Sequence, residues 1–276
     1  MGGAGKRPRA PRRLTARSVP SDPRPPARSE PGSCDPAACE PPGVVYAVGD
    51  VHGRAHELRR LVDRIKAHAR RRRVARPAVV FLGDYVDRGP DSAGVLDLLS
   101  SPELHAMFHP VLLMGNHDRQ MLLAWGNLIG GEYLLEWLVG WGGAETVASY
   151  GIATWHRRVP DVMAEFRAAV PRQHIEFLAG LSLCHRVGRL FFCHAGVAPG
   201  VALDRQTAET LLFGVGGVFL RYRGDYGARI VHGHFASPAV DIRRNRINVD
   251  SSAGHPLARL SAVAIAGEDV EVIEAW

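Results

Sequence analysis

The chain has 276 residues, of which 46% are hydrophobic and 22% are charged, so it can bury a sizeable core in one large domain or two small ones. It holds no apolar run of transmembrane length, so we expect no membrane partner. The formal net charge of +6 comes mostly from residues 1–42, which carry eight Lys or Arg against four Asp or Glu.

Residues 1–42 predict a disordered tail. They hold ten of the 19 prolines and are poor in aromatic residues, so they cannot bury enough surface to offset the entropy of ordering. No apolar stretch follows the basic residues, which argues against a secretory signal. We expect the tail to aid solubility; contact with nucleic acid or acidic lipid through this basic segment is the alternative, and no nucleic-acid partner is expected elsewhere.

The four cysteines predict free thiols. Cys34, Cys39, Cys184 and Cys193 form no CxxC pair, and two of them lie in the predicted tail. Free thiols are typical of a reducing compartment, so we expect a cytoplasmic protein.

Residues 43–276 predict one folded domain in which strands and helices alternate. The first strand, "VVYAVGD" (44–50), precedes a helix with Leu58, Leu61, Val62 and Ile65 at the i, i+3, i+4, i+7 spacing. Further strands are expected at 78–84 and 110–116, and further helices at 92–101, from 117, and over most of 127–180. Strand-like runs return at 189–196, 228–234, 245–251, 257–267 and 269–275. This order predicts an α/β domain with mixed sheets.

Five strand ends share one pattern, in which apolar residues lead to a glycine and then to Asp, Asn or His. They read "VGDVHG" (48–53), "GDYVDRG" (83–89), "GNHD" (115–118), "CHAG" (193–196) and "HGH" (232–234). Because ligands of α/β sheets gather at the carboxyl ends of strands, we expect these loops to converge. The side chains collected there are Asp50, His52, Asp84, Asn116, His194 and His234.

These six side chains predict two divalent metal ions. Carboxylate, imidazole and amide ligands without a thiolate suit Mn, Fe or Zn, and Mn is our first expectation. Six ligands exceed what one such ion takes from protein while keeping water, whereas two ions about 3.5–4 Å apart can share a carboxylate. We expect Asp84 to be that bridge, because its strand is central in the predicted order.

Neighbouring residues predict a phosphoester site around the metals. Arg88 offers a planar fork suited to phosphate oxygens, and Asn116 is expected to contact phosphate as well as metal. His117 follows Asn116 and could act as the general acid for the leaving oxygen. Asp87 could orient that imidazole.

The five motifs in this order resemble the phosphoprotein phosphatase branch of the calcineurin-like metallophosphoesterases, with the closest likeness to bacterial and phage serine/threonine protein phosphatases. The resemblance covers roughly Val44 to Ser252. It implies an αββα sandwich of two mixed β-sheets flanked by helices, with a dinuclear metal centre. It assigns to the first metal Asp50, His52 and Asp84, and to the second Asp84, Asn116, His194 and His234. It also implies that Arg88 contacts phosphate and that His117 and Asp87 form the acid pair.

The chain departs from the family pattern at a second phosphate-binding arginine. Family members place it in a stretch resembling "LLWIR", whereas this chain reads "ETLLFGVGGVFLRYRGD", with glycines and a valine at 214–217. Arg221 or Arg223 could substitute from a shifted loop. Losing one bidentate phosphate contact weakens substrate or transition-state binding by a few kcal/mol.

Other candidates have ordinary explanations. Tyr133, Trp137 and Trp141 lie at helical spacing and are expected to be core residues. His232 is expected to be a sheet residue, and Asp250 either supports the site or forms a strand-end turn.

Three functions follow as hypotheses. The first is a phosphomonoesterase that dephosphorylates phosphoserine or phosphothreonine in a protein or peptide substrate by direct attack of a metal-bound hydroxide. The second is a symmetrical dinucleoside polyphosphate hydrolase, which shares the "GNHD" form of the third motif but tends to lack an aspartate at position 87. The third is a non-catalytic reader of phosphorylated partners, motivated by the absent arginine.

Overall fold

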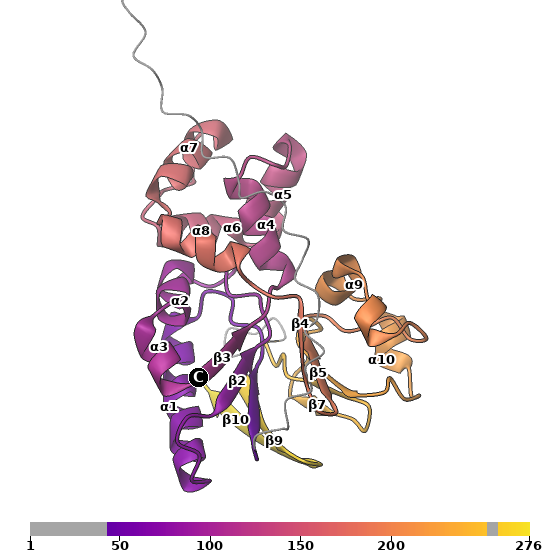
Figure 1. Ribbon diagram of the computed structural model, residues 1–276. Coiled ribbons are helices and arrows are strands. Elements are labelled where there is room, and N and C mark those ends of the chain that lie inside the picture. The colour runs from indigo at the N-terminus through magenta and orange to yellow at the C-terminus, as the bar shows by residue number, and fades with distance from the viewer. Residues whose placement is uncertain (1–42, 253–258) are drawn as a thin grey trace, which may run out of the picture.

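Two five-stranded mixed sheets pack face to face, as Figure 1 shows for the computed structural model, which describes residues 43–252 and 259–276. The predicted tail, 1–42, lies outside the described residues. The first sheet has the order β10-β9-β1-β2-β3, with β1, β2 and β3 parallel. The second has the order β4-β5-β6-β8-β7, with β5, β6 and β8 parallel. The bounds are β1 Val45–Val48, β2 Ala78–Phe81, β3 His109–Leu112, β4 Cys184–Val187, β5 Leu190–Cys193, β6 Arg229–His232, β7 Asp241–Ile242, β8 Arg246–Asn248, β9 Leu260–Ala266 and β10 Asp269–Ala275.

Helices cover both outer faces of the sandwich and one of its ends (Figure 1). Helices α1 to α3 lie on the first sheet, α9 and α10 lie on the second, and α4 to α8 gather at the end where the parallel strands finish. The bounds are α1 Ala55–Arg71, α2 Ser92–Leu99, α3 Pro102–Met107, α4 Asn116–Trp125, α5 Gly131–Gly140, α6 Gly143–Ser149, α7 Val159–Ala169, α8 Arg172–Ala179, α9 Ala208–Phe213 and α10 Gly217–Arg221. The expected αββα sandwich is confirmed.

Three apolar clusters join these layers. One lies between the sheets and includes Val80 of β2 and Val231 of β6, which alternate with residues on the outer faces. Another packs the first sheet against the helices, and it buries the apolar face of α1 that the helical spacing predicted. The third joins α9 and α10 to β5 and β6. Burial on both faces explains why the strands read as continuous apolar runs.

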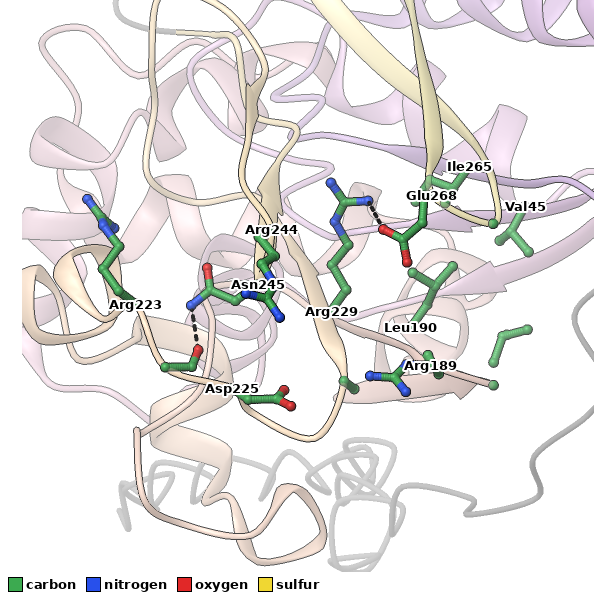
Figure 2. Close-up of a pocket in the computed structure, with 15 residues that line it drawn as sticks. Val45, Arg189, Leu190, Arg223, Asp225, Arg229, Arg244, Asn245, Ile265 and Glu268 are labelled. Carbon is green, nitrogen blue, oxygen red and sulfur yellow. Dashed lines mark hydrogen bonds and ion pairs between the residues drawn. The ribbon is translucent and has the colours of Figure 1, made fainter.

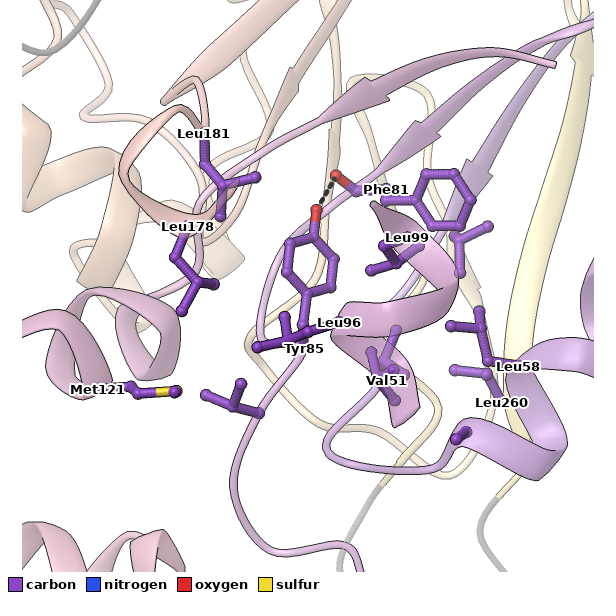
Figure 3. Close-up of a cluster of buried hydrophobic side chains, with 14 of the residues drawn as sticks. Val51, Leu58, Phe81, Tyr85, Leu96, Leu99, Met121, Leu178, Leu181 and Leu260 are labelled. Carbon is purple, nitrogen blue, oxygen red and sulfur yellow. Dashed lines mark hydrogen bonds between the residues drawn. The ribbon is translucent and has the colours of Figure 1, made fainter. Parts of the chain in front are cut away.

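The helix-side core also anchors the loop after β2. Figure 3 shows Tyr85 pointing into this core beside Leu96 and Leu178, with its hydroxyl donating to the carbonyl oxygen of Phe81 at 3.2 Å. Tyr85 is fully buried. A polar loop is therefore held in place by an aromatic side chain within its own motif.

Some elements escaped prediction because they are short or polar. β4 reads "CHRV", β7 has two residues, and α3 follows α2 after two residues, 100 and 101, that the sequence pattern places in the helix expected at 92–101. Cys193 is a buried free thiol, as expected, whereas Cys184 is disulfide-bonded, so the expectation of free thiols is wrong there. Within the described ranges, no helix combines the length and apolarity needed to cross a membrane. The cytoplasmic location stays a prediction.

Candidate metal centre and active site

The loops that carry the predicted residues converge at the carboxyl ends of β1, β2, β3, β5 and β6. Eight non-glycine residues have positive φ among those the structure describes, and five of them belong to these loops. They are His52 (φ 46°), Asp84 (51°), Asp87 (71°), Arg88 (65°) and His234 (64°). Such backbone strain costs about 1–3 kcal/mol per residue and clusters at functional sites.

Motif glycines let the backbone reach the carboxylates. A Cβ atom at Gly115 would lie 2.1 Å from Oδ1 of Asp84, and one at Gly233 would lie 2.0 Å from Oδ1 of Asp50. Any larger residue would push these carboxylates out of place.

Asp84 is shared by two clusters of metal-binding atoms. One cluster joins Asp84 to His194 and His234, and the other joins it to His52 and His117, with ligand atoms within 4.8 Å of one another in each. The Oδ2 atom of Asp84 lies 3.4 Å from Nε2 of His194 and 3.6 Å from Nε2 of His52. This position between two imidazoles fits a carboxylate that bridges two ions.

Asn116 belongs to the first of these clusters. Its Oδ1 atom lies 2.9 Å from Nε2 of His194 and 3.0 Å from Nδ1 of His234. The amide oxygen and three of the predicted ligands therefore point at one place.

The histidine tautomers fit metal binding. Nδ1 of His52 lies 3.0 Å from the carbonyl oxygen of Val86, and Nδ1 of His194 lies 2.9 Å from that of Leu82. A carbonyl only accepts, so each Nδ1 donates, which orients each Nε2 toward Asp84. Burial lowers the pKa of His52 to about 3, so its imidazole is neutral near pH 7. The Asp84 and Asp50 carboxylates outweigh burial at His194 and raise its pKa to about 10, so a metal ion would have to displace the proton on its Nε2. We conclude that the residues present fit a dinuclear divalent metal centre.

Asp50 lies at the edge of this centre. Its carboxylate accepts from the backbone N–H of His234 at 3.1 and 3.2 Å. Burial and the nearby Asp250 carboxylate raise the pKa of Asp50 well above its usual range. Asp250 also accepts from the backbone N–H of Ser252, so it forms the expected turn and shapes the electrostatics of the site. A cation between these carboxylates would relieve their repulsion.

His117 and Asp87 form a buried pair. Nδ1 of His117 lies 2.8 Å from Oδ2 of Asp87, and Asp87 is fully buried. Asp87 also accepts from Nε1 of Trp137 at 3.0 Å and from Oγ1 of Thr146 at 2.7 Å. Burial raises the pKa of Asp87, and this effect outweighs the hydrogen bonds from His117, Thr146 and Trp137, which lower that pKa. The carboxylate is thus held on three sides and fixes the imidazole.

Arg88 connects this pair to the candidate metal ligand His52. Its guanidinium donates to Nε2 of His52 at 2.8 Å and to Nε2 of His117 at 3.0 Å. A guanidinium has only donors, so both ring nitrogens accept. Arg88 therefore lies between a predicted metal ligand, His52, and the predicted acid, His117.

Asp118 supports the site and was not assigned this task by the sequence. It is fully buried and accepts three backbone N–H bonds, from Asp84 at 2.8 Å, Tyr85 at 2.8 Å and Gly115 at 2.9 Å. It thereby ties the loop after β2 to the loop after β3. Trp137 and Thr146 were also missed as supports, because they lie 50 and 59 residues from Asp87 and carry no local signal.

The structure separates the two arginines proposed as a second phosphate fork. Arg223 lines a cavity of about 730 Å³ at the opposite end of the sandwich, together with Val45, which begins β1 (Figure 2). Arg223 therefore does not face the candidate metal ligands. Arg221 folds back over its own helix, where a Cβ atom at Gly217 would lie 2.5 Å from its Nη1.

Of the aromatic residues expected in the core, only Trp137 is fully buried. Tyr133 is 66% exposed, so that expectation is wrong for it: it lies in the first turn of α5, on the face of Trp137 but one turn earlier, where the core no longer covers the helix. Trp141 is half-buried and packs against the ring of His117. His232 ends β6 and is fully buried, as expected for a sheet residue.

The fold and the clustered metal-binding side chains agree with the family that the sequence comparison identifies. The chain belongs to the calcineurin-like phosphoesterase family, whose sequence model matches residues 43–255.

Relatives within this family carry different activities in their names. The chain is 31% identical over 157 residues to a symmetrical bis(5'-nucleosyl)-tetraphosphatase of Legionella pneumophila. The matched region covers 56% of this chain and 45% of that protein. It is 33% identical over 111 residues to a Caenorhabditis elegans protein provisionally named a serine/threonine-protein phosphatase. This match covers 40% of the chain and 25% of that protein. The chain thus spans less than half the length of these curated relatives.

Solved structures share the fold. One described provisionally as a diadenosine tetraphosphatase superposes with a TM-score of 0.59 at 22% identity, over 85% of this chain and 94% of that one. A cold-active protein-tyrosine phosphatase of Shewanella superposes with a TM-score of 0.53 at 16% identity, over 85% and 80%.

Proposed function

We propose that the chain hydrolyses phosphate monoesters, and that its substrates are phosphoserine and phosphothreonine side chains of proteins. The observation that carries this proposal is the buried His117–Asp87 pair. A serine or threonine oxygen leaves as a strongly basic alkoxide, so it needs a proton in the transition state. As an imidazolium paired with the Asp87 carboxylate, and with Arg88 turned to the phosphate, His117 supplies that proton from Nε2.

Each remaining residue has a role in this proposal. Asp50, His52, Asp84, Asn116, His194 and His234 hold the two divalent ions, for which we propose Mn²⁺. When bound, such ions polarise phosphoryl oxygens and lower the pKa of bound water. Arg88 turns its fork from the two imidazoles to the phosphate oxygens, and Asn116 adds an amide contact to phosphate. Asp87 keeps Nε2 of His117 directed at the leaving oxygen.

Hydrolysis of a symmetrical dinucleoside polyphosphate is the second candidate. The relatives with that name and the shared "GNHD" motif favour it. The leaving group of that reaction is itself a phosphate, which departs without a proton at neutral pH. Proton donation by His117 would therefore accelerate it little. The buried support around Asp87 therefore favours the monoester.

A comparison of initial rates tests the proposal. At fixed Mn²⁺, a phosphothreonine peptide should be hydrolysed with a higher kcat/KM than diadenosine tetraphosphate, and Asp84→Asn should abolish both reactions. A higher kcat/KM for the dinucleotide would select the second candidate. Metal binding without turnover of any phosphoester would indicate a reader of phosphorylated partners instead.

A further inference from the structure

A cavity of about 730 Å³ lies at the end of the sandwich opposite the candidate metal ligands (Figure 2). It is bounded by the turns between β4 and β5, β7 and β8, and β9 and β10, and by the loop that leads into β6. The strands β5 and β6 therefore begin beside this cavity and end beside the predicted ligands His194 and His234. Pockets for small organic molecules measure about 300–1,000 Å³, so the cavity is large enough for one.

The buried part of the cavity lining is apolar. It includes Val45, Val187, Leu190 and Ile265, all of which belong to the apolar cluster between the two sheets. Val45 is paired with Ile265 across β1 and β9, and Val187 is paired with Leu190 across β4 and β5. Each sheet thus contributes one apolar pair. An apolar body that entered the cavity would leave water for contact with these side chains, which is favourable.

The charged part of the lining has a positive surplus. It consists of four arginines, Arg189, Arg223, Arg229 and Arg244, and two acids, Asp225 and Glu268, so the formal surplus is two positive charges. Within the described part of the chain, Arg189, Arg223 and Arg244 form no ion pair. Asp225 accepts from the backbone N–H of Gly227 at 2.8 Å, and the side chain of Glu268 is 98% exposed. The two acids therefore leave most of the arginine charge uncompensated.

Arg229 presents a fixed donor at this cavity. Its Nε and Nη2 atoms donate to the carbonyl oxygen of Arg243 at 3.1 and 2.9 Å, which fixes the plane of the guanidinium. Its Nη1 atom is buried and has no hydrogen-bond partner among the residues that the structure describes. Oε2 of Glu268 lies 4.0 Å from Nη1, which is too far for a hydrogen bond. A buried donor without a partner is unfavourable, and an oxygen of a bound anion would satisfy it.

We propose that this cavity binds a small organic anion, with a doubly charged phosphate-type head at Arg189, Arg229 and Arg244 and an apolar body against the core between the sheets. A guanidinium presents paired donors that match phosphate oxygens. A head of charge −2 equals the positive surplus of the lining, whereas a cation would meet guanidinium groups without acidic partners. Binding here requires no hydrolysis at the metal centre, so the cavity is a second ligand site of the chain.

Calorimetry with 1-naphthylphosphonate tests this site, because the bond from carbon to phosphorus in this probe is not a phosphoester. The protein is the full chain with Asp84→Asn, which removes the proposed metal bridge and so separates the cavity from binding at the metals. This protein should bind one molecule of the probe. Adding Arg189→Ala and Arg244→Ala should weaken binding by about tenfold or more, since each removes a charged contact. Both side chains are exposed, so the melting temperature should stay unchanged.

The matched control is Arg243→Ala in the same background. Arg243 neighbours Arg244 and carries the same charge, but its guanidinium pairs with Asp241 and does not line the cavity. This control should bind the probe within about twofold of its parent. Methylphosphonate, which has the same head without the apolar body, should bind the parent at least about tenfold more weakly than the naphthyl probe. The proposal would be overturned by an absence of probe binding in the Asp84→Asn protein, by a loss in the double variant no larger than that of Arg243→Ala, or by equal affinities for the two phosphonates.

Discussion

Asp118 offers a sharp test of how the site is supported. Asp118→Ala removes the acceptor of three buried backbone N–H groups, in Asp84, Tyr85 and Gly115. Each buried group left without a partner costs about 1–3 kcal/mol. Burial, with the nearby Asp84 carboxylate, raises the pKa of Asp118 to about 7, so the buried charge is itself unfavourable and its removal offsets part of the loss. We therefore expect the lower end, a fall of about 3 kcal/mol in the free energy of unfolding.

The assay is urea unfolding of the metal-free protein, followed by metal titration of the folded variant. Asp118→Asn keeps one acceptor oxygen and should fall between the wild type and Asp118→Ala. Asp63→Ala, an exposed position on α1, is the control and should stay within about 0.5 kcal/mol of the wild type. If Asp118→Ala unfolded at the urea concentration of the wild type and bound metal equally well, the two loops would not depend on this carboxylate.

Three further predictions concern the chemistry. Arg88→Ala should lower kcat/KM on the order of a hundredfold, because it removes a charged, bidentate phosphate contact. Arg221→Ala should change kcat/KM by less than about threefold, and a large loss would make Arg221 the second phosphate-binding arginine. Asp87→Asn should lower kcat for a phosphothreonine peptide by about a hundredfold and for p-nitrophenyl phosphate much less, since nitrophenolate leaves without a proton; equal losses would contradict the acid role of His117. Dialysis against EDTA should abolish turnover and lower the melting temperature, and Mn²⁺ should restore both; turnover that survives metal removal would exclude a metal centre.

The convergence of the predicted ligand side chains was predictable because its signals are local. Asp50, Asp84 and His194 follow apolar strands directly, and parallel strands bring their carboxyl ends to one edge. The helix-side core was predictable for the same reason, since the spacing from Leu58 to Ile65 defines one helix face. Both depend on residues within a few positions of one another.

The support around the acid pair was not predictable, because it comes from distant segments. Trp137 and Thr146 reach Asp87 from α5 and α6, and no pattern within either helix indicates that contact. The same limit explains Tyr133, whose helical spacing with Trp137 suggested the core although only Trp137 is buried, because the spacing does not show how far along the helix the core extends. Arg223 shows the converse, since closeness in sequence to the expected motif did not bring it to the site.

The central claim is a pair of divalent ions bridged by Asp84, and metal content per chain tests it most directly. Plasma mass spectrometry of protein loaded with Mn²⁺ and freed of excess metal should find two ions per chain in the wild type and at most one in Asp84→Asn, with both proteins folded by circular dichroism. Two tightly held ions in Asp84→Asn, or none in the wild type, would contradict the account.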